Sequence, residues 1–253
     1  MAYINSVVTF IDVLGFTELV RSDPSGDEVL RVASSFRLYG TEDLDGRRAS
    51  QRGTAIQFSD CVLRCTPPRE EDEGVSSLDI LEEIEDLTYL QGELAAQGIL
   101  LRGGIAVGPA HIGADGVFGP AVVDAYTLEN KHALYPRIVL HPDVTNRFST
   151  EGHSGRGVYA KDQVLLTRAS DDGLYFVDYL RNFPREVHTD LSPYRERTAR
   201  SYMLPRKVLI ERELARLGPL DTRRPKYAWL ARYHNDVARD ILHHAAADVM
   251  VAL

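Results

Sequence analysis

Two aspartates, Asp12 and Asp60, lie where carboxylates could take part in chemistry. Asp12 ends an apolar segment, residues 5–13, that is typical of a buried strand, where an unpaired charge is costly. Asp60 follows Ser59 in a predicted turn between two short strands within residues 54–66. If these strands are neighbours, both carboxylates reach one edge of a sheet. Two carboxylates with nearby backbone carbonyls suit Mg²⁺ or Mn²⁺, and such ions usually bind together with phosphate oxygens.

The same two residues also fit a purely structural role. Aspartate is common in tight turns, as at Asp60, and before helices, as at Asp12. Taken alone, the two positions favour the structural role, so the neighbouring sequence has to decide between the interpretations.

The segments around the aspartates alternate between strand and helix patterns. After the strand at residues 5–13, the pattern predicts a helix at 26–39 and a hairpin at 54–66. A helix at 78–97 follows, because leucine and isoleucine recur there every three or four residues. A second hairpin is expected at 99–113, since its Gly108-Pro109 dipeptide is typical of a corner.

A helix at 120–134 and a strand at 136–141 complete this pattern. The order of elements predicts an α+β fold, with helices on one face of a mostly antiparallel sheet. Beyond it, residues 163–179 predict a further hairpin, and the chain has a helical pattern from about residue 195. We therefore expect a main domain at 1–180 and a C-terminal helical extension at 181–253.

Composition excludes several classes of protein. The 253-residue chain has 44% hydrophobic and 26% charged residues, which is ordinary for a soluble globular protein, and its net charge of -8 argues against a generic nucleic-acid binder. Its two cysteines, Cys61 and Cys65, are too few for a disulfide framework and fit a reducing compartment. The sequence shows neither a signal-peptide pattern nor an uncharged apolar run of about 20 residues. We expect a cytoplasmic protein that does not insert into a membrane.

Four blocks of sequence resemble those of the class III adenylyl and guanylyl cyclases, in the same order. Residues 10–17 (FIDVLGFT) resemble the first strand of the family, F-x-D-[IV]-x-G-F-T, and residues 58–61 (FSDC) resemble its second metal-binding hairpin. Residues 101–108 (LRGGIAVG) are similar to a strand of the form L-R-x-G-I-x-x-G. Residues 118–129 (FGPAVVDAYTLE) stand where the family has an aromatic-glycine pair followed by V-N-x-A-x-R-x-E.

The resemblance implies a cyclase catalytic domain with a ferredoxin-like antiparallel sheet covered by helices. It implies that Asp12 and Asp60 bind two Mn²⁺ or Mg²⁺ ions, with the Val13 carbonyl as a further ligand. One ion would lower the pKa of the ribose 3′-hydroxyl, and the other would hold the triphosphate. The implied reaction is in-line attack of the 3′-oxygen on the α-phosphorus with diphosphate leaving. Asp12, Asp60 and Arg102 are the implied catalytic residues.

The resemblance also assigns the contacts to phosphate. Backbone N–H groups of Gly15, Phe16 and Thr17 would bind the β- and γ-phosphates at the start of a helix, which is a natural anion site. The guanidinium of Arg102 would neutralise phosphate charge. Because this family builds its active site between two subunits, a homodimer is implied.

Two positions depart from the family pattern. Val123 stands where cyclases have the asparagine that orients the ribose, and Thr127 stands where they have the arginine that stabilises the transition state. Loss of that arginine removes a favourable interaction with developing charge. Either another cation supplies it, such as Lys131 or a C-terminal arginine, or the site works slowly.

The positions that read a purine base differ as well. Ile56 replaces a lysine, and Gly116 and Val117 stand near an expected aspartate. These departures, the compact length and residues 226–235 (KYAWLARYHN) resemble the pyrimidine cyclases of bacterial Pycsar antiviral defence, which make cyclic UMP or cyclic CMP for a separate effector. We favour UTP as the substrate. Ile56 and Gln57 are the candidate contacts to the base, although a solvent-facing role fits Gln57 equally.

Two other functions stay open. One is an adenylyl cyclase that makes cyclic AMP in an unusual purine pocket. The other is a degenerate cyclase-like domain that senses a nucleotide or binds a partner, which Val123 and Thr127 suggest. Residues 194–232 hold eleven Lys or Arg and four Asp or Glu. That balance fits a solvated helix pair, a dimer arm or donors to the triphosphate better than a nucleic-acid-binding tail.

Overall fold

The computed structural model describes residues 3–36, 53–70, 72–113, 116–150, 166–168, 172–182 and 195–252. The last residues of the helix predicted at 26–39 and the first residues of the hairpin predicted at 163–179 lie outside this part of the chain.

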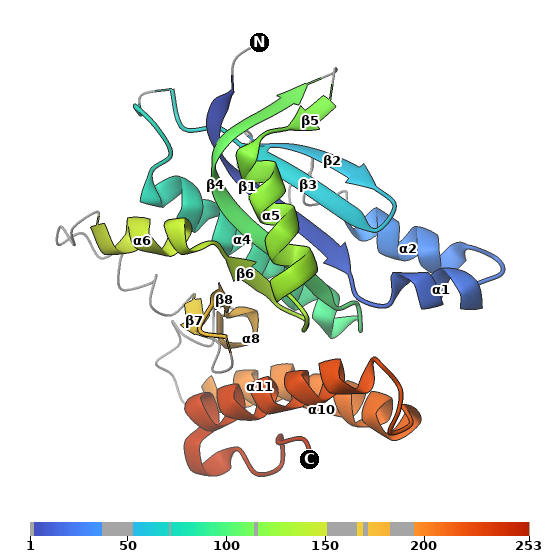
Figure 1. Ribbon diagram of the computed structural model, residues 1–253. Coiled ribbons are helices and arrows are strands. Elements are labelled where there is room, and N and C mark those ends of the chain that lie inside the picture. Colours follow the sequence, from blue (N-terminus) through green and yellow to red (C-terminus); the bar gives the residue numbers. More distant parts are fainter. Residues whose placement is uncertain are drawn as a thin grey trace.

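Eight strands of the described residues form one sheet, in the order β2-β3-β1-β4-β6-β8-β7, with β5 paired to β4 (Figure 1). Every pair is antiparallel except β4 with β6. The prediction of an α+β fold with a mostly antiparallel sheet is therefore confirmed. The strands are β1 (Ile4–Val13), β2 (Thr54–Phe58), β3 (Cys61–Thr66), β4 (Leu101–Gly113), β5 (Gly116–Phe118), β6 (Ile138–Leu140), β7 (Leu166–Arg168) and β8 (Tyr175–Val177).

The helices include short connecting turns as well as long packed elements. The longest helix of the main part is α4, where the sequence predicts residues 78–97. The helical elements are α1 (Phe16–Ser22), α2 (Asp27–Ser35), α4 (Ser77–Ala96), α5 (Pro120–Thr127), the π-helical turn η1 (Leu128–His132), α6 (Pro142–Thr150), α8 (Tyr179–Asn182), α10 (Arg195–Arg216), α11 (Arg224–Leu242) and the 3₁₀ turn η2 (His243–Ala245).

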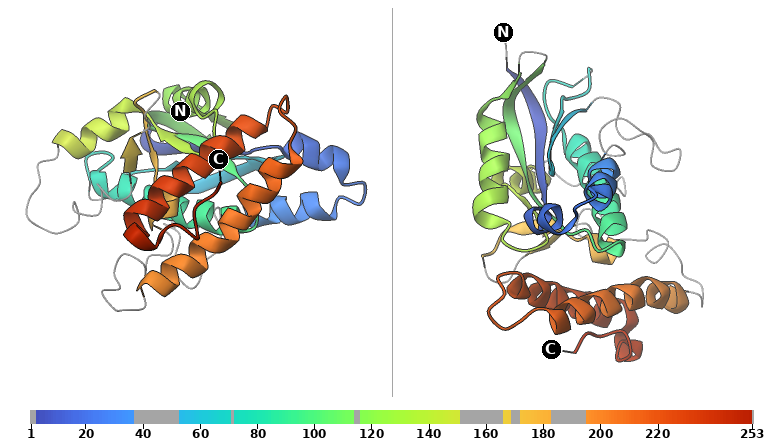
Figure 2. Two further views of the ribbon diagram at one scale, coloured as in Figure 1. Left: turned by 90° about the horizontal axis from the view of Figure 1, so that it is seen from below. Right: turned by 90° about the vertical axis from the view of Figure 1, so that its right-hand side faces the viewer.

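Helices lie on both faces of the sheet (Figure 2), whereas the sequence pattern predicted helices on one face only. On one face Val7 of β1 packs in the same apolar core as Ile84 of α4. On the other face Val8 packs with Ala121 and Ala125 of α5. Successive strand residues point to opposite faces, so β1 is buried on both sides because each face has its own helix.

Polar contacts fix β1 and β3 against α4. The Thr9 hydroxyl of β1 donates to Oε1 of Glu83 at 2.7 Å, and Nη1 of Arg64 on β3 donates to Oδ2 of Asp86 at 2.9 Å. Thr9, Arg64 and Glu83 are each at most 2% exposed. Buried polar groups need such partners, so these contacts specify the position of the two strands that lead to Asp12 and Asp60.

One predicted corner is wrong. β4 continues through Gly108 and Pro109, and Pro109 pairs with Asn5 of β1. Proline removes one donor from the ladder, but pairing with β1 continues on both sides of it and holds the strand. The hairpin lies further along the chain, where Gly113 pairs with Gly116 of β5.

The C-terminal helices pack on the main part of the molecule. Nη2 of Arg206 on α10 donates to the Gly92 carbonyl of α4 at 2.8 Å. The Tyr233 hydroxyl of α11 donates to Oδ1 of Asp178 at 2.6 Å and accepts from the Leu180 N–H at 3.1 Å. Residues of α10 and α11 thus share one apolar core with α4 and α8. Within the described part of the chain, no helix has the length and apolar character needed to cross a membrane.

Candidate functional site

Asp12 and Asp60 meet at one edge of the sheet. Asp12 lies near the end of β1, and Asp60 lies in the tight turn from β2 to β3, where Ser59 adopts a φ of 56°. The antiparallel register pairs Ile11 with Val62, so the end of β1 lies beside the start of β3. Ligand atoms of Asp12, Asp60 and Cys61 all lie within 4.8 Å of one another.

The two carboxylates are close enough to influence each other's charge. The pKa of Asp60 is raised, first because the group is partly buried and then because Asp12 lies beside it. Two carboxylates that share a site disfavour simultaneous ionisation. A divalent cation offsets that repulsion, and carboxylate oxygens are the ligands that Mg²⁺ and Mn²⁺ prefer. The donor set of this cluster therefore fits a hard divalent metal ion.

Cys61, the residue after Asp60, borders this cluster. Its Sγ lies 3.4 Å from Oδ1 of Asp12, to which the thiol donates. Burial and, after it, the negative charge of Asp12 raise the pKa of the Cys61 thiol to about 12. The sulfur therefore stays protonated at neutral pH and acts as a donor to Asp12.

Arg102 faces Asp12 directly across the β1–β4 pair. Its Nε and Nη2 both lie 2.9 Å from Oδ2 of Asp12. Nη2 also lies 2.8 Å from Oε1 of Glu129, whose side chain is 4% exposed. The Arg102 guanidinium thus bridges Asp12, a candidate metal ligand, and the buried carboxylate of Glu129. The sequence predicted a phosphate contact for Arg102, and the structure places two carboxylates on it.

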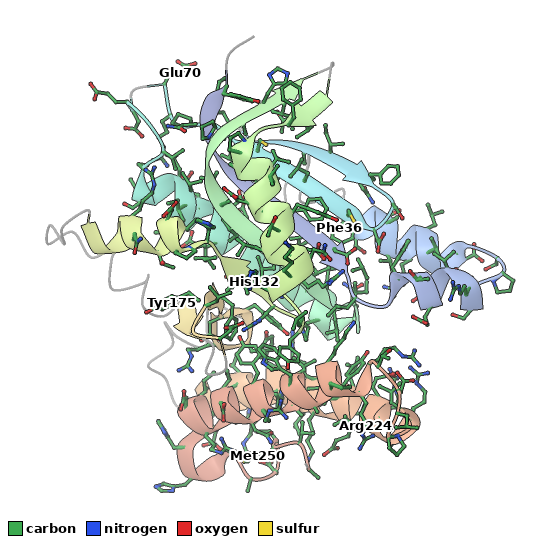
Figure 3. The ribbon with its side chains drawn as sticks, viewed as in Figure 1. Phe36, Glu70, His132, Tyr175, Arg224 and Met250 are labelled. Carbon is green, nitrogen blue, oxygen red and sulfur yellow. The ribbon has the colours of Figure 1, made fainter. Side chains whose placement is uncertain are left out.

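Sequence reasoning missed Glu129 as part of the site, although it is the last residue of the fourth cyclase-like block. Burial raises the pKa of Glu129, Arg102 opposes that shift, and Asp12 and Asp60 add to it. Glu129 lies in the π-helical turn η1, which ends at His132 (Figure 3). Such turns are rare and frequently mark functional sites. Its place at the end of the fourth cyclase-like block is the signal in the sequence that could have found it.

Gly104 lets α5 and η1 approach β4 closely. A Cβ atom at Gly104 would lie 2.5 Å from the Ala125 carbonyl oxygen and 2.5 Å from Cβ of Leu128. Only glycine fits such a contact between a strand and a helix. The glycine therefore allows Glu129 to reach Arg102.

The residues predicted to bind phosphate lie at the start of α1. Gly15 is the N-cap, with a φ of 85°, and it follows Val13, a buried residue at the end of β1. Phe16 is buried in the main core, and Thr17 is exposed. The first N–H groups of any helix have no partner within it, and here they follow Asp12 by a few residues.

The candidate base contacts lie on β2, the outermost strand on this side of the sheet. Ile56 is 40% exposed. The Gln57 amide is committed to the backbone, since Nε2 donates to the Ala33 carbonyl at 3.0 Å. Its amide oxygen is the group that is available for a base.

The two positions that depart from the cyclase pattern lie on α5. Val123 is 61% exposed, Thr127 is half-buried, and Lys131 in η1 is exposed. Tyr126 beside them is 49% exposed and packs edge-to-face on Phe10 at 5.5 Å between ring centroids. The exposed side of α5 thus carries Val123 and Tyr126 beside the charged Asp124, and the asparagine and arginine of the cyclase pattern are not present on it.

Two solved structures are similar to this chain. One is a class III adenylyl cyclase-like ATP-binding protein from Pseudomonas aeruginosa, 17% identical, with a TM-score of 0.42 over 57% of this chain and 35% of that protein. The other is an adenylate/guanylate cyclase/hydrolase from Silicibacter pomeroyi, also 17% identical with a TM-score of 0.42, over 69% of this chain and 94% of that protein. The match thus spans about a third of the length of the Pseudomonas protein. No protein-family model and no curated protein sequence matches the chain.

The chemistry of the site follows from its own side chains. Asp12, Asp60 and Glu129 concentrate negative charge, and Arg102 neutralises part of it. Oδ2 of Asp12 is occupied by Arg102, while Oδ1 points to the side of Cys61. Such an arrangement can bind a divalent cation and, through it, the phosphate oxygens of a ligand.

Proposed function

We propose that this chain is a class III nucleotidyl cyclase, which converts a nucleoside triphosphate into a 3′,5′-cyclic monophosphate and diphosphate. The observation that carries the proposal is the meeting of Asp12 and Asp60 at one sheet edge. The sequence blocks around both residues resemble those of class III cyclases, and Arg102 comes from a third such block. Because residues from three separate blocks meet in one acidic cluster, a catalytic role for the cluster is better supported than a structural role in a turn.

Each residue of the cluster has a part in the proposed reaction. Mn²⁺ or Mg²⁺ bound by Asp12, Asp60 and the Val13 carbonyl would supply Lewis-acid activation of the ribose 3′-hydroxyl and the phosphates. Arg102 orients Asp12 by donating to Oδ2. The 3′-oxygen bonds to the α-phosphorus, the bond from that phosphorus to the diphosphate breaks, and the hydroxyl proton passes to solvent. Backbone N–H groups of Gly15, Phe16 and Thr17 bind the outgoing phosphates.

UTP is the proposed substrate. The residues at the base-reading positions support a pyrimidine, because Ile56, Gly116 and Val117 lack the polar groups that a purine pocket needs. Among the described residues no donor reaches the oxygen of the Gln57 amide, which can accept from a base, while its nitrogen donates to the Ala33 and Ser59 carbonyls. Cyclic UMP would then act on a separate effector in the cytoplasm during antiviral defence.

A homodimer is proposed because large apolar side chains are exposed on α5 and at the tip of β2. Val123 and Tyr126 expose apolar surface on that helix, and Phe58 at the tip of β2 is 81% exposed. Exposed apolar residues of this size favour a protein interface. Tyr126→Asp should shift the chain to a monomer in light scattering coupled to size exclusion. A wild-type monomer at cellular concentration would contradict this part of the proposal.

A second candidate function is a nucleotide-binding module without turnover. Val123 and Thr127 favour it, because valine has no hydrogen-bonding group to orient a ribose and the threonine hydroxyl carries no positive charge to replace an arginine. Such a module would bind a nucleotide and a partner but release no diphosphate.

One assay decides between these functions. Purified protein with Mn²⁺ is incubated with UTP, CTP, ATP or GTP, and the products are separated by chromatography. Cyclic UMP is expected, and Asp60→Asn should abolish it, whereas Glu73→Gln, an exposed acidic residue outside the cluster, should keep it. A purine product would move the assignment to an adenylyl or guanylyl cyclase, and binding without any cyclic product would favour the module.

A further inference from the structure

The loop between α10 and α11 brings the start of α11 to the edge of the acidic site. In Figure 1 this loop lies on the side of the molecule where α1 begins, and Arg224 marks its position in Figure 3. Arg223 interacts electrostatically with Glu18 of α1. The end of α10 and the start of α11 therefore lie near the segment that follows Asp12.

Three cations crowd the N-terminal end of α11, and no acidic residue lies in its first turn. This arrangement is unfavourable because the helix dipole makes that end positive. Two of the cations have partners within the chain. Arg223 pairs with Asp221 at 2.7 Å, and Arg224 donates to the carbonyls of Leu214 and Leu217 at 2.6 and 2.8 Å.

Lys226 is the third cation, and its surroundings differ. It is half-buried, and no residue in the described part of the chain accepts a hydrogen bond from its ammonium group or forms a salt bridge with it. It interacts electrostatically with Arg102, Asp12 and Glu18. Burial and then the positive charge of Arg102 lower the pKa of Lys226.

Partial burial of this side chain disfavours its charged form, and the second cation nearby disfavours it further. An anion with several oxygens relieves both, because it can accept from Lys226 while it also neutralises Arg102. A polyphosphate is such an anion, and Asp12 and Asp60 would bind the divalent cation that accompanies it.

We propose that Lys226 binds the polyphosphate of the nucleotide, and the diphosphate product, in the same chain that supplies Asp12 and Asp60. This inference rests on the proposed cyclase function and assigns part of it to the C-terminal helices. When the bond between the α-phosphorus and the diphosphate breaks, the leaving diphosphate gains negative charge, which the ammonium of Lys226 stabilises without losing its proton. The cation that α5 lacks at Thr127 thus comes from α11.

Binding of inorganic diphosphate in the presence of Mn²⁺, measured by titration calorimetry on the full chain, tests the proposal. Lys226→Met keeps the aliphatic part of the side chain and removes its charge, so diphosphate should bind about tenfold or more weakly. Lys226→Arg should restore most of the affinity. Arg239→Gln is the matched control, because it removes an exposed cation from the same helix, about 20 Å further along its axis. It should bind diphosphate as the wild type does.

Kinetics and thermal melting separate the outcomes. Lys226→Met should raise KM for the triphosphate and lower kcat, and because it removes a disfavoured charge it should raise rather than lower the melting temperature in the absence of ligand. If it binds diphosphate as tightly as the wild type while the wild type forms a cyclic product, the role of Lys226 is overturned and the cyclase function stands. If the wild type neither binds diphosphate nor forms a cyclic product, both proposals fail together.

Discussion

Arg102 places Nε and Nη2 at the same distance, 2.9 Å, from a single oxygen of Asp12, Oδ2. The other oxygen, Oδ1, is left to the Cys61 thiol and the side of Asp60. Arg102 thus fixes the orientation of the Asp12 carboxylate through Oδ2, which leaves Oδ1 as the candidate ligand for a metal ion. The arrangement is pre-organised, because the register of β1 and β4 sets Arg102 opposite Asp12.

Breaking this link should destabilise the fold. Arg102→Leu leaves Glu129 as a buried carboxylate without its cation and should cost about 2 kcal/mol of unfolding free energy in urea titrations. The double variant with Glu129→Gln should lose less than the sum of the single losses, with a coupling of about 1 kcal/mol. Arg239→Gln, whose ion pair with Asp236 is exposed, should stay within error of the wild type. Strictly additive losses at Arg102 and Glu129 would show that the pair does not interact.

Removing one of the paired carboxylates should stabilise the protein without metal. Asp60 has a raised pKa because of burial and of Asp12, so its charged form is disfavoured in the folded state. Asp60→Asn should therefore raise the melting temperature in chelator. Mn²⁺ should raise the melting temperature of the wild type and have a much smaller effect on the variant. An equal rise in both would place the metal elsewhere.

The close approach of α5 to β4 should tolerate no side chain larger than hydrogen. Gly104→Ala puts a Cβ 2.5 Å from the Ala125 carbonyl oxygen, so α5 and η1 must move. The loss in unfolding free energy should be about 2 kcal/mol or more, and Mn²⁺ binding should weaken as Glu129 is displaced. Gly74→Ala meets nothing within 4 Å and serves as the control. If Gly104→Ala is as stable as the wild type, the space between β4 and α5 is larger than the structure shows.

Acid should destabilise the chain through His234, which lies on α11. Its Nε2 bonds to the Val249 carbonyl at 3.0 Å, and Nδ1 is buried with no hydrogen-bond partner among the described residues. Burial lowers the pKa of His234 from 6.5 to about 4. Between these pH values the imidazole is therefore protonated in the unfolded chain and neutral in the folded chain. Stability should thus fall as pH drops from 6.5 to about 4, by about 3 kcal/mol from this group.

The pH profile of His234→Gln provides the check. Urea midpoints measured between pH 7 and pH 4 should fall less steeply in this variant than in the wild type. His244→Gln, an exposed histidine of the same region, should follow the wild type. If the slopes of His234→Gln and wild type coincide, a different group controls the acid transition.

Local patterns in the sequence determined most of the elements. The short apolar run of β1, the helical spacing in α4 and the turn at Ser59 and Asp60 depend on neighbouring residues only, so they can be read without knowing the fold. The expectation that Asp12 and Asp60 meet also follows from local signals, since each aspartate stands at the end of a predicted strand. The corner expected at Gly108 failed because pairing with β1, a long-range contact, outweighs a local turn signal.

Tertiary structure alone decided what surrounds the two aspartates. Glu129 reaches Arg102 because η1 departs from α-helical spacing and Gly104 lets it approach, and neither fact is a pattern in the sequence. Lys226, from the far end of the chain, comes within electrostatic reach of Arg102 and Asp12 because α10 and α11 pack on α4 and α8. Sequence periodicity says which face of a helix is buried but not which helix it packs against, and that choice brings these charges together.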